Sequence, residues 1–521
     1  MSPTKRCMEY QILKTPTEES GDSSREDHNI ATSPGETDND TIAEKEEKIA
    51  STENMVSPAD LKTRHLGFTR TLFLVVCGAM IGTGAQFGYA LGVMNAPSEV
   101  IKNFTKLIYY RRYNSTLTDH RADLLYSTTI SVIALGGVLG GLLAGPICDR
   151  LGRFDDKGFL IRMIMGFQGF GAVAGSLYIT EIAPLQVRGS FGACFQLFMA
   201  MAIMLAQVLG LDIILGNDRL WNYLFIVPIG FSLLQIILLV FAYDTPKFLL
   251  QKEREQAAER ALKWFRYEKD NAIVQAEIRE MHADLNNLKT NSTKITLQDL
   301  LQKPLLRKCL LISSMTHVAQ QLIGSNVIFY FGDVILARTN LPYEFAPYAS
   351  LSFGITYLAV AVTLVFILDK VGRRSLFLYG LVGMGVAAMG IGVTILKSKS
   401  IRLYHMIFLN IFSIMGHAGF FALGPGAIPW VITSEMFFQS ERAYASSFAI
   451  IANWLTSFVV VQSFIPLFNA IDSILFLIYG GICMGVFLLS YLLLPETRRK
   501  IPEQVQILVA KGTVYKAKHQ Q

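Results

Sequence analysis

The sequence contains few charged residues and no pattern that supports catalysis. Only 17% of its 521 residues are Asp, Glu, Lys or Arg, 51% are hydrophobic, and the mean hydropathy is +0.37. This composition is too apolar for a soluble protein of that length. The sequence also shows no nucleophile with a base, no metal-ligand spacing and no phosphate-cradling loop, so we predict that the protein is not an enzyme and needs no cofactor or metal.

Cysteine is scarce, and the N-terminal segment lacks hydrophobic runs. The six cysteines, at positions 7, 77, 148, 194, 309 and 483, form neither a disulfide framework nor a metal-binding spacing. Residues 1–70 are rich in Ser, Thr, Glu and Asp and contain no cleavable signal. We therefore predict a disordered cytoplasmic tail over residues 1–70.

Long apolar runs are abundant in the rest of the chain. A helix needs roughly 20 apolar residues to cross a bilayer, and repeated runs of that length indicate an all-α polytopic membrane protein. The eleven predicted spans lie near residues 71–94, 124–148, 159–180, 190–211, 220–243, 309–332, 347–368, 375–396, 404–430, 443–467 and 473–494.

The distribution of basic residues predicts the orientation of these spans. Thirteen Lys and Arg lie between Lys247 and Lys308, and the C-terminal tail is also basic. The positive-inside rule places the linker, residues 244–308, and the tail, residues 495–521, in the cytoplasm. They delimit two membrane bundles, residues 71–243 and 309–494. The net charge of +6 is thus an orientation signal and predicts no nucleic-acid partner.

The loop between the first two spans carries two candidate glycosylation sites. Asn103-Phe-Thr105 and Asn114-Ser-Thr116 both match the acceptor pattern for N-glycosylation. The same pattern also occurs at Asn291 in the predicted cytoplasmic linker, so it arises by chance as well. Glycosylation of Asn103 and Asn114 therefore requires that their loop faces the outside.

The two bundles are related by a tandem duplication. An acidic residue followed by six residues and an arginine occurs once in each half, and two further motifs are paired around it. Parallel repeats of spans are typical of secondary transporters, whose substrate site lies between the halves near the membrane midplane. The matched pairs are Glu181 to Arg188 with Glu435 to Arg442, Asp149 to Arg153 with Asp369 to Arg374, and Asp244-Thr-Pro246 with Pro495-Glu-Thr497.

Six ordered motifs between Thr71 and Thr497 resemble those of the facilitative hexose transporters of the major facilitator superfamily. The resemblance implies a fold of two homologous helix bundles in the plasma membrane that moves a hexose by alternating access. Lipid and the sugar are then the partners. The motifs are Gln86-Phe-Gly-Tyr89 with Asn95-Ala-Pro97, Asp149 to Arg153, Glu181 to Gly189, Gln320-Gln-Leu-Ile-Gly-Ser-Asn326, Gly424-Pro-Gly-Ala-Ile-Pro-Trp430 and Pro495-Glu-Thr497.

Side-chain amides within the spans are the candidate sugar ligands. An amide both donates and accepts hydrogen bonds without a charge that would have to be buried, and the resemblance implies sugar contact at the matching positions. The alternative is that these amides bind neighbouring helices. Gln320, Gln321 and Asn326 could share one cavity wall if the helix is irregular around Gly324. The candidate amides are Gln196, Gln320, Gln321, Asn326 and Asn453.

Trp430 closes a stretch rich in Gly and Pro. Its ring offers an apolar face to the C–H side of a sugar and one N–H donor, while Gly424, Pro425, Gly426 and Pro429 break the helix that carries it. Such breaks are expected where a segment lines a cavity. We predict that Trp430 contacts the sugar; the alternative is an anchor at the membrane interface.

The paired charged motifs are interpreted as a conformational switch. The resemblance implies salt bridges between the halves at their cytoplasmic ends, which form in one conformation only and thereby shift a two-state equilibrium. Plain topogenic charge is the alternative, although it does not explain the paired acids. The candidates are Asp149, Arg150, Arg153, Glu181, Arg188, Asp369, Arg373, Arg374, Glu435, Arg442 and Glu496.

The sequence predicts transport without proton coupling. Proton-driven carriers place a carboxylate inside a span, and no Asp or Glu falls well inside the eleven predicted spans. Ala90 follows Phe-Gly-Tyr where similar proton-coupled relatives carry Asp. His317 and His417 remain as candidate proton carriers, but a lone membrane histidine is more often a hydrogen-bonding partner. We therefore predict a uniporter.

The choice of hexose stays open at this level. His317 opens the tripeptide that stands where glucose-preferring members carry Gln-Leu-Ser, and Ala422 with His417 resembles the fructose-transporting branch. Trp430 instead resembles the glucose branch, and Tyr357 replaces an asparagine of the family. Glucose, fructose or both fit this combination.

The first half is shorter than the second by about one span. Asp149 and Glu181 are 32 residues apart, whereas Asp369 and Glu435 are 66 residues apart, and the difference matches one span with its loop. The third helix is thus predicted to be missing. If residues 159–180 crossed the membrane, the basic linker would lie outside, so we predict a re-entrant segment there.

Three hypotheses follow from the sequence. The first is a facilitative hexose uniporter with a shortened first half. The second is a non-transporting sugar sensor, or an inactive, dominant-negative variant that lacks a helix. The third is a sugar/proton symporter.

Overall fold

The computed structural model describes residues 69–151, 175, 178–179, 181–183, 188–267, 270–291, 297–368, 370–400 and 404–511. Within these ranges every regular element is a helix. Residues 1–68 of the predicted tail, which was placed at residues 1–70, and most of the predicted segment 159–180 lie outside them, so neither prediction is tested by the structure. All structural statements below concern the described residues.

The first half begins with a membrane helix that changes its winding in the middle. This helix is continuous through α3 (Arg70–Met80), the π-helical segment η1 (Ile81–Ala85) and α4 (Gln86–Gly92). The sequence Ile-Gly-Thr-Gly-Ala in η1 has two glycines at close contacts, Gly82 beside Gln235 of α10 and Gly84 beside the Phe195 backbone of α9. The other helices of this half are α5 (Ser98–Tyr113), α6 (Asp119–Leu151), α9 (Arg188–Leu209), η2 (Trp221–Phe225) and α10 (Val227–Leu239).

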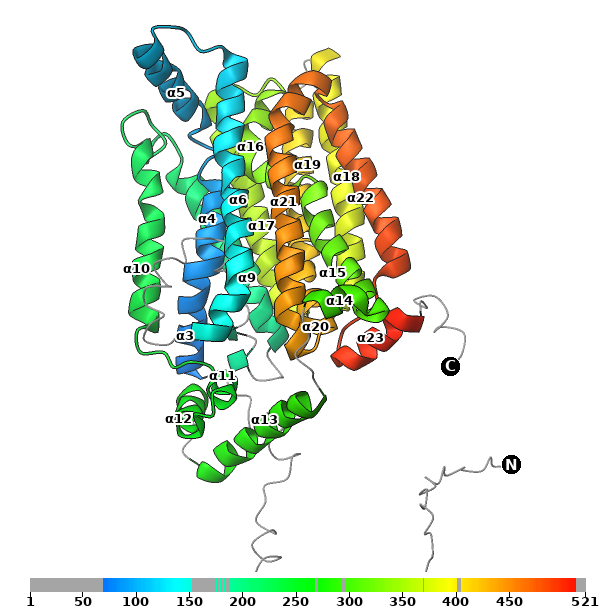
Figure 1. Ribbon diagram of the computed structural model, residues 1–521. Coiled ribbons are helices and arrows are strands. Elements are labelled where there is room, and N and C mark those ends of the chain that lie inside the picture. The colour runs from blue at the N-terminus through cyan, green and yellow to red at the C-terminus, as the bar shows by residue number, and fades with distance from the viewer. Residues whose placement is uncertain are drawn as a thin grey trace, which may run out of the picture. The chain divides into compact units, whose positions relative to one another are not determined.

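The linker consists of four helices, α11 (Pro246–Gln251), α12 (Glu255–Arg266), α13 (Asn271–Asn291) and α14 (Leu297–Gln302). In α12, Ala258, Ala261, Leu262 and Phe265 recur on one face and are buried, as expected for an amphipathic helix. Figure 1 shows α11, α12 and α13 at the end of the bundle opposite to α5.

Among the described residues of the second half, five helical stretches are long and apolar enough to cross a membrane, and one of them combines α19 with α20. The helix formed by α15 and α16 is interrupted between Leu322 and Ser325. The helices of this half are α15 (Pro304–Leu322), α16 (Ser325–Ala337), η3 (Tyr343–Phe345), α17 (Ala346–Ile367), α18 (Arg373–Ser400), α19 (Tyr404–Leu423), α20 (Ile428–Met436), α21 (Gln439–Ile471) and α22 (Ile474–Leu493). The tail contains α23 (Pro502–Lys511).

Eight of the eleven predicted spans coincide with helices long and apolar enough to cross a membrane. The predicted span 190–211 corresponds to α9, whose apolar stretch Ala193–Leu209 is shorter. The predicted span 309–332 is divided between α15 and α16. The chain is therefore an integral membrane protein, whereas the count of eleven spans and the missing third helix stay predictions.

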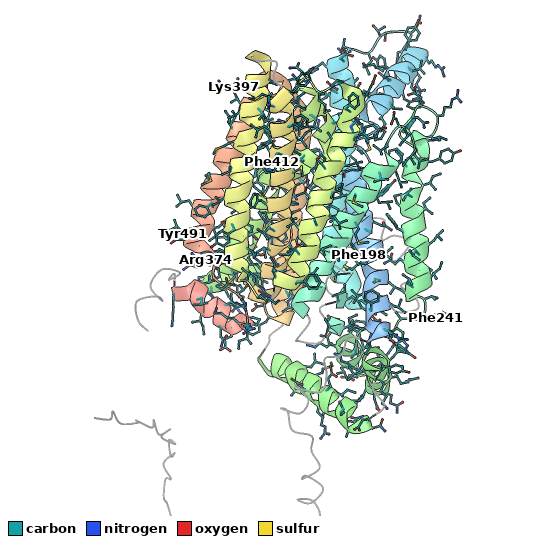
Figure 2. The ribbon with its side chains drawn as sticks, turned by 180° about the vertical axis from the view of Figure 1, so that it is seen from behind. Phe198, Phe241, Arg374, Lys397, Phe412 and Tyr491 are labelled. Atoms are coloured by element: carbon teal, nitrogen blue, oxygen red, sulfur yellow. The ribbon has the colours of Figure 1, made fainter. Side chains whose placement is uncertain are left out.

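Side chains on the outer surface of the bundle agree with a lipid environment. Phe241, just after α10, is 83% exposed and Phe412 on α19 is 70% exposed; both are labelled in Figure 2. Large exposed apolar side chains are rare in clusters on soluble proteins. Arg374, also labelled there, lies beside Tyr491 with its guanidinium 5.2 Å from the ring centroid.

The two halves meet along two helix pairs. α6 of the first half packs along α21 of the second, and α9 packs along α17; Figure 1 shows α6 beside α21. In both pairs, one helix belongs to the first half of the predicted duplication and the other to the second half. The helices α9, α15 and α20 carry residues of the candidate site, and α15 packs against α20 and α21.

Candidate functional site

Four amides of the second half form a continuous hydrogen-bonded cluster, which we call the amide cluster: Gln320, Gln321, Asn326 and Asn453. Asn326 Nδ2 donates to Gln321 Oε1 at 2.7 Å, and Gln321 Nε2 donates to Asn453 Oδ1 at 3.1 Å. Asn453 Nδ2 donates to Gln320 Oε1 at 2.8 Å. All four are at most 5% exposed. The structure thus brings together four of the five amides that the sequence singled out.

A break between α15 and α16 positions this cluster. α15 ends at Leu322 and α16 begins at Ser325, with Gly324 at φ +76° between them. A left-handed backbone conformation is easy only for glycine. The break lets Gln321 and Asn326, five residues apart, bond to each other. The sequence analysis named such an irregularity around Gly324 as the condition for these residues to share one wall.

A second break joins the cluster to Trp430. α19 ends at Leu423 and α20 begins at Ile428, and the carbonyls of Pro425 and Gly426 between them accept hydrogen bonds from Gln320 Nε2 at 2.7 and 2.8 Å. Free carbonyls at a helix break need such donors because they have lost their helical partners. Part of the Gln320 side chain is therefore committed to structure.

Trp430 lies between the halves and is partly buried. Its ring centroid is 5.0 Å from His317 of α15 and 5.8 Å from Phe195 of α9, which belongs to the first half. His317 Nε2 is 3.2 Å from Thr433 Oγ1. Trp430 thus contacts aromatic rings of both halves, and its predicted contact with the sugar stays a prediction.

Gln196 bonds across the two halves to a residue that the sequence analysis did not place in the site. Gln196 Nε2 of α9 donates to the hydroxyl oxygen of Tyr357 on α17, and both side chains are buried. The Tyr357 ring is 5.1 Å from Phe329 and 6.0 Å from Phe421 between centroids. The sequence marked Tyr357 only as a replacement for an asparagine, and nothing in its spacing indicated this bond.

One expectation about charge is wrong. The sequence analysis found no carboxylate well inside a span, because the predicted span ended at residue 332. In the structure α16 continues to Ala337, and Asp333 within it is 0% exposed. Its Oδ1 accepts hydrogen bonds from Asn95 Nδ2 at 2.7 Å and from the Ser350 hydroxyl. Because Asp333 lies buried in this helix, the absence of carboxylates no longer supports transport without a coupled proton.

The acidic residues of the duplicated motifs occupy equivalent positions in both halves. Thr245 Oγ1 donates to Glu181 Oε2 at 2.5 Å, and Thr497 Oγ1 donates to Glu435 Oε2 at 2.5 Å. Each bond connects the motif of an acid, six residues and an arginine in one half to the motif that follows the last predicted span of the same half. The paired motifs in the sequence therefore correspond to paired contacts in space.

The ion pair of the switch motifs lies within the second half. Arg373 Nη2 at the start of α18 is 3.0 Å from Glu435 Oε1 on α20, whereas the resemblance implied salt bridges between the halves. Glu496 accepts hydrogen bonds from the backbone N–H groups of Arg373 and Arg374 at 2.9 and 3.3 Å. Arg442 Nη2 donates to the Phe437 carbonyl at 3.2 Å. These contacts hold the start of α18, the end of α20 and the start of α21 close to one another.

The remaining switch candidates have no described side chain. Arg153 and Asp369 lie outside the described residues, and Asp149, Arg150 and Arg188 are described as backbone in helices α6 and α9 only. Their predicted roles are not tested.

The two glycosylation candidates lie on α5 and at its end. Both side chains are exposed. Asn103 is helical, and Asn114 is the left-handed residue that follows the last residue of α5, with φ 49°. Accessibility is necessary for glycosylation, which stays a prediction.

The chemistry of the site is that of neutral hydrogen bonding. The amide cluster, Gln196 and Trp430 offer donors, acceptors and an aromatic face, and none carries a charge. The described residues contain no group of three or more His, Cys, Asp or Glu that could hold a metal ion. Such a site can exchange internal hydrogen bonds for those of a polyhydroxyl solute.

The fold is that of the major facilitator superfamily. A solved structure of the proton:xylose symporter XylE bound to 6-bromo-6-deoxy-D-glucose superposes with a TM-score of 0.67 at 21% identity, covering 84% of this chain and 98% of that chain. The partially occluded inward-open xylose transporter XylE from E. coli gives a TM-score of 0.65 at 20% identity. It covers 83% of this chain and 100% of the other.

The family follows from the sequence comparisons. The model of the "Sugar (and other) transporter" family matches residues 75–155 and 157–508. The facilitated glucose transporter member 1 of Gallus gallus is 31% identical over 477 residues, which are 85% of this chain and 94% of that protein. Member 9 of Mus musculus is 31% identical over 469 residues, 84% of this chain and 86% of that protein. The chain belongs to the sugar transporter family, a family of membrane carriers and not of enzymes.

Proposed function

We propose that the protein carries a hexose, such as glucose or fructose, across the membrane by facilitated diffusion. The observation that supports this most directly is the buried amide cluster at the break between α15 and α16, whose Gln320 bonds to the carbonyls of Pro425 and Gly426 just before the helix that carries Trp430. It is uncharged and rich in both donors and acceptors. The names of the relatives, facilitated glucose transporters, agree with this choice.

Sugar binding then consists of exchanging partners within the amide cluster. In the described conformation Gln321 and Asn326 bond to each other and to Asn453 and Ser457. A hexose hydroxyl both donates and accepts, so it replaces one such bond with little net loss. Burying a charge instead would cost several kcal/mol. Neutral amides therefore suit a solute that must be released on the other side.

Alternating access requires that contacts between the halves form and break. The described side-chain bonds between halves include Ser131 Oγ to Gln462 Oε1 at 2.6 Å, Tyr348 to Asp212 at 2.9 Å and Gln196 to Tyr357. These three bonds join α6, α9 or the loop after α9 to α17 or α21. We infer that the Arg373–Glu435 pair and its neighbours keep each half rigid while these contacts change.

The test is hexose flux and binding in reconstituted vesicles. We expect counterflow of D-glucose or D-fructose over an L-glucose background, and loss of at least tenfold in sugar affinity, about 1.4 kcal/mol, in Gln321→Ala and Asn326→Ala. Asn410→Ala is the matched control: Asn410 is a buried amide of the same half that bonds to Thr394, away from the cluster. Unchanged hexose binding in both cluster variants would refute the proposed site.

The main alternative is a sugar-binding protein that does not transport. It rests on the predicted loss of the third helix, and the family match breaks at residue 156, close to the point where the first half is short. Sugar-dependent thermal stabilisation without counterflow would favour this alternative. A sugar/proton symporter is the third candidate because Asp333 is buried; sugar-driven acidification of the vesicle interior would establish it.

A further inference from the structure

Asp333 sits at a contact between the halves, near the end of the bundle that carries α5. Asn95 follows α4 of the first half, whereas Asp333 and Ser350 belong to α16 and α17 of the second. Asn95 Nδ2 donates to Asp333 Oδ1 at 2.7 Å, and the Asp333 backbone N–H donates to Asn95 Oδ1 at 3.1 Å. We call these three residues the Asp333 contact. Each is at most 1% exposed.

The hydrogen bonds reach only one carboxylate oxygen. Asn95 and Ser350 both donate to Oδ1, and Oδ2 is buried without a partner among the described residues. A buried carboxylate ion needs donors or a counter-charge on both oxygens, and its desolvation without them costs several kcal/mol. A proton on Oδ2 removes that charge. The geometry therefore fits the neutral acid better than the anion.

No cation of the described residues compensates Asp333. The titratable groups of α5 and of the elements around α16 have other partners or are not bonded to it. In α5, burial would lower the pKa of Lys102, but Glu99 and Asp123 outweigh burial and raise it. Lys102 pairs with Glu99 and Asp123, Arg338 pairs with Asp472, and Tyr348 bonds to Asp212. Tyr89 and Tyr126 bond to the carbonyls of Leu224 and Met94, Tyr357 bonds to Gln196, and His317 bonds to Thr433. The groups that form no bond to Asp333 are Tyr330 on α16, His405 and His417 on α19, and Glu441 and Arg442 on α21.

We propose that Asp333 binds a proton from the outside solution each time the halves close over it, which makes the conformational equilibrium and the sugar flux depend on external pH. When the halves separate at this end, Asn95 leaves with the first half and water reaches the carboxyl, which ionises at neutral pH as solvated aspartic acid does. Closing takes up one proton, and opening returns it to the same side. The proton is therefore a regulator and is not transported.

The sign follows from this proton balance. The closed state holds one more proton than the open state, so acidic external solution favours closure and alkaline solution favours opening. Full coupling to one proton changes the open-to-closed ratio by at most about tenfold per pH unit. The assignment of this end to the outside rests on the predicted orientation.

The experiment reads the conformation directly. Gln462 lies at a neighbouring contact between the halves, where its amide bonds to Ser131 and Thr128. In Gln462→Cys, labelling by a membrane-impermeant maleimide should rise as external pH increases. Asp333→Asn, which mimics the neutral acid, should make labelling low and independent of pH. Asp472→Asn is the matched control, because Asp472 is an acid that pairs with Arg338 of the same half and should leave the pH response intact.

Several outcomes would overturn the inference. One is labelling of Gln462→Cys that does not change with external pH. Another is labelling that still depends on pH after Asp333→Asn is added to Gln462→Cys. Should Asp333→Asn fail to reach the membrane, Ser350→Ala removes one donor to Oδ1 and should shift the labelling curve to lower pH; an unchanged curve contradicts the proposal.

The predicted effect of Asp333 on sugar flux rests on the proposed hexose transport, and a flux experiment distinguishes the two. Hexose uptake should follow external pH without acidifying the vesicle interior, and sugar-driven acidification that is lost in Asp333→Asn would show that the proton crosses the membrane. A protein with pH-dependent labelling but no hexose flux would refute the proposed function while leaving the role of Asp333 intact.

Discussion

At the scale of single residues, the site depends on which polar atoms are already satisfied. The Gln320 side chain bonds to two backbone carbonyls and to Asn453. These bonds leave it less able to bind a solute, so its main role is to position the cluster. Gln321, Asn326 and Gln196 bond mainly to other side chains, and these bonds can be exchanged. Tyr357 competes with any ligand for the Gln196 amide.

Tyr357→Phe tests the bond between the halves. The change leaves the buried Gln196 N–H without its acceptor, and side-chain hydrogen bonds in membranes contribute about 0.6 to 1.7 kcal/mol. We expect the conformational equilibrium, measured by maleimide labelling of Gln462→Cys, to shift toward the open state by about threefold to twentyfold. Tyr89→Phe removes a tyrosine bond to the Leu224 carbonyl within the first half and should lower thermal stability without that shift. Equal labelling in both variants would contradict the prediction.

At the scale of elements, two interrupted helices create the site. α15 and α16 are separated at Gly324, and α19 and α20 at Gly424 to Ala427. Both breaks expose backbone groups inside the bundle, where water cannot satisfy them, and Gln320 satisfies those of the second break. The first span also departs from regular α geometry in η1. The two breaks of the second half thus position Gln320, Gln321 and Asn326.

Gly324→Ala tests the first break. Left-handed backbone costs a non-glycine residue roughly 1–2 kcal/mol, and an added Cβ would lie 3.0 Å from the ring of Tyr479. We expect a lower melting temperature and weaker hexose binding, because Gln321 and Asn326 flank the break. Gly485→Ala on α22, where nothing lies within 4 Å of the added Cβ, should leave both unchanged. Full hexose affinity in Gly324→Ala would argue against the break as the organiser of the site.

At the scale of the whole molecule, the described conformation is held together toward the end that carries α5. The bonds of Asn95 to Asp333, of Ser131 to Gln462 and of Asp212 to Tyr348 all connect the halves there. The Arg373–Glu435 pair and the Thr245–Glu181 bond instead stay within a half. Each half is thus braced internally, and the halves are joined at this end by a few side-chain hydrogen bonds that can be broken one by one.

Cross-linking tests whether this end must open. A short bifunctional thiol reagent that joins Ser131→Cys to Gln462→Cys should abolish hexose counterflow, because it fixes α6 to α21. The matched pair Arg338→Cys and Asn469→Cys also replaces a hydrogen-bonded contact, at 2.5 Å, but within the second half, and its cross-link should leave flux intact. Flux that persists in the first cross-linked protein would rule out opening at this contact.

Much of this architecture was readable from the sequence for a simple reason. Bilayer thickness fixes the length of an apolar span, and a duplication repeats its motifs, so the helical membrane fold, eight of the spans and the equivalence of Glu181 with Glu435 followed from composition and spacing. The amides and the two helix breaks also followed, because Gly, Pro and buried amides are conspicuous in apolar runs. The family comparison confirmed the class of protein.

Only the tertiary structure decided how residues far apart in the chain combine. The bond of Gln196 to Tyr357 spans 161 residues and that of Asn95 to Asp333 spans 238, and no local pattern encodes such partners. Span boundaries are equally uncertain, because hydropathy falls gradually, and a boundary one residue short concealed Asp333. Local sequence determines which segments enter the membrane; packing of the two halves determines which polar groups meet there and which are left without a partner.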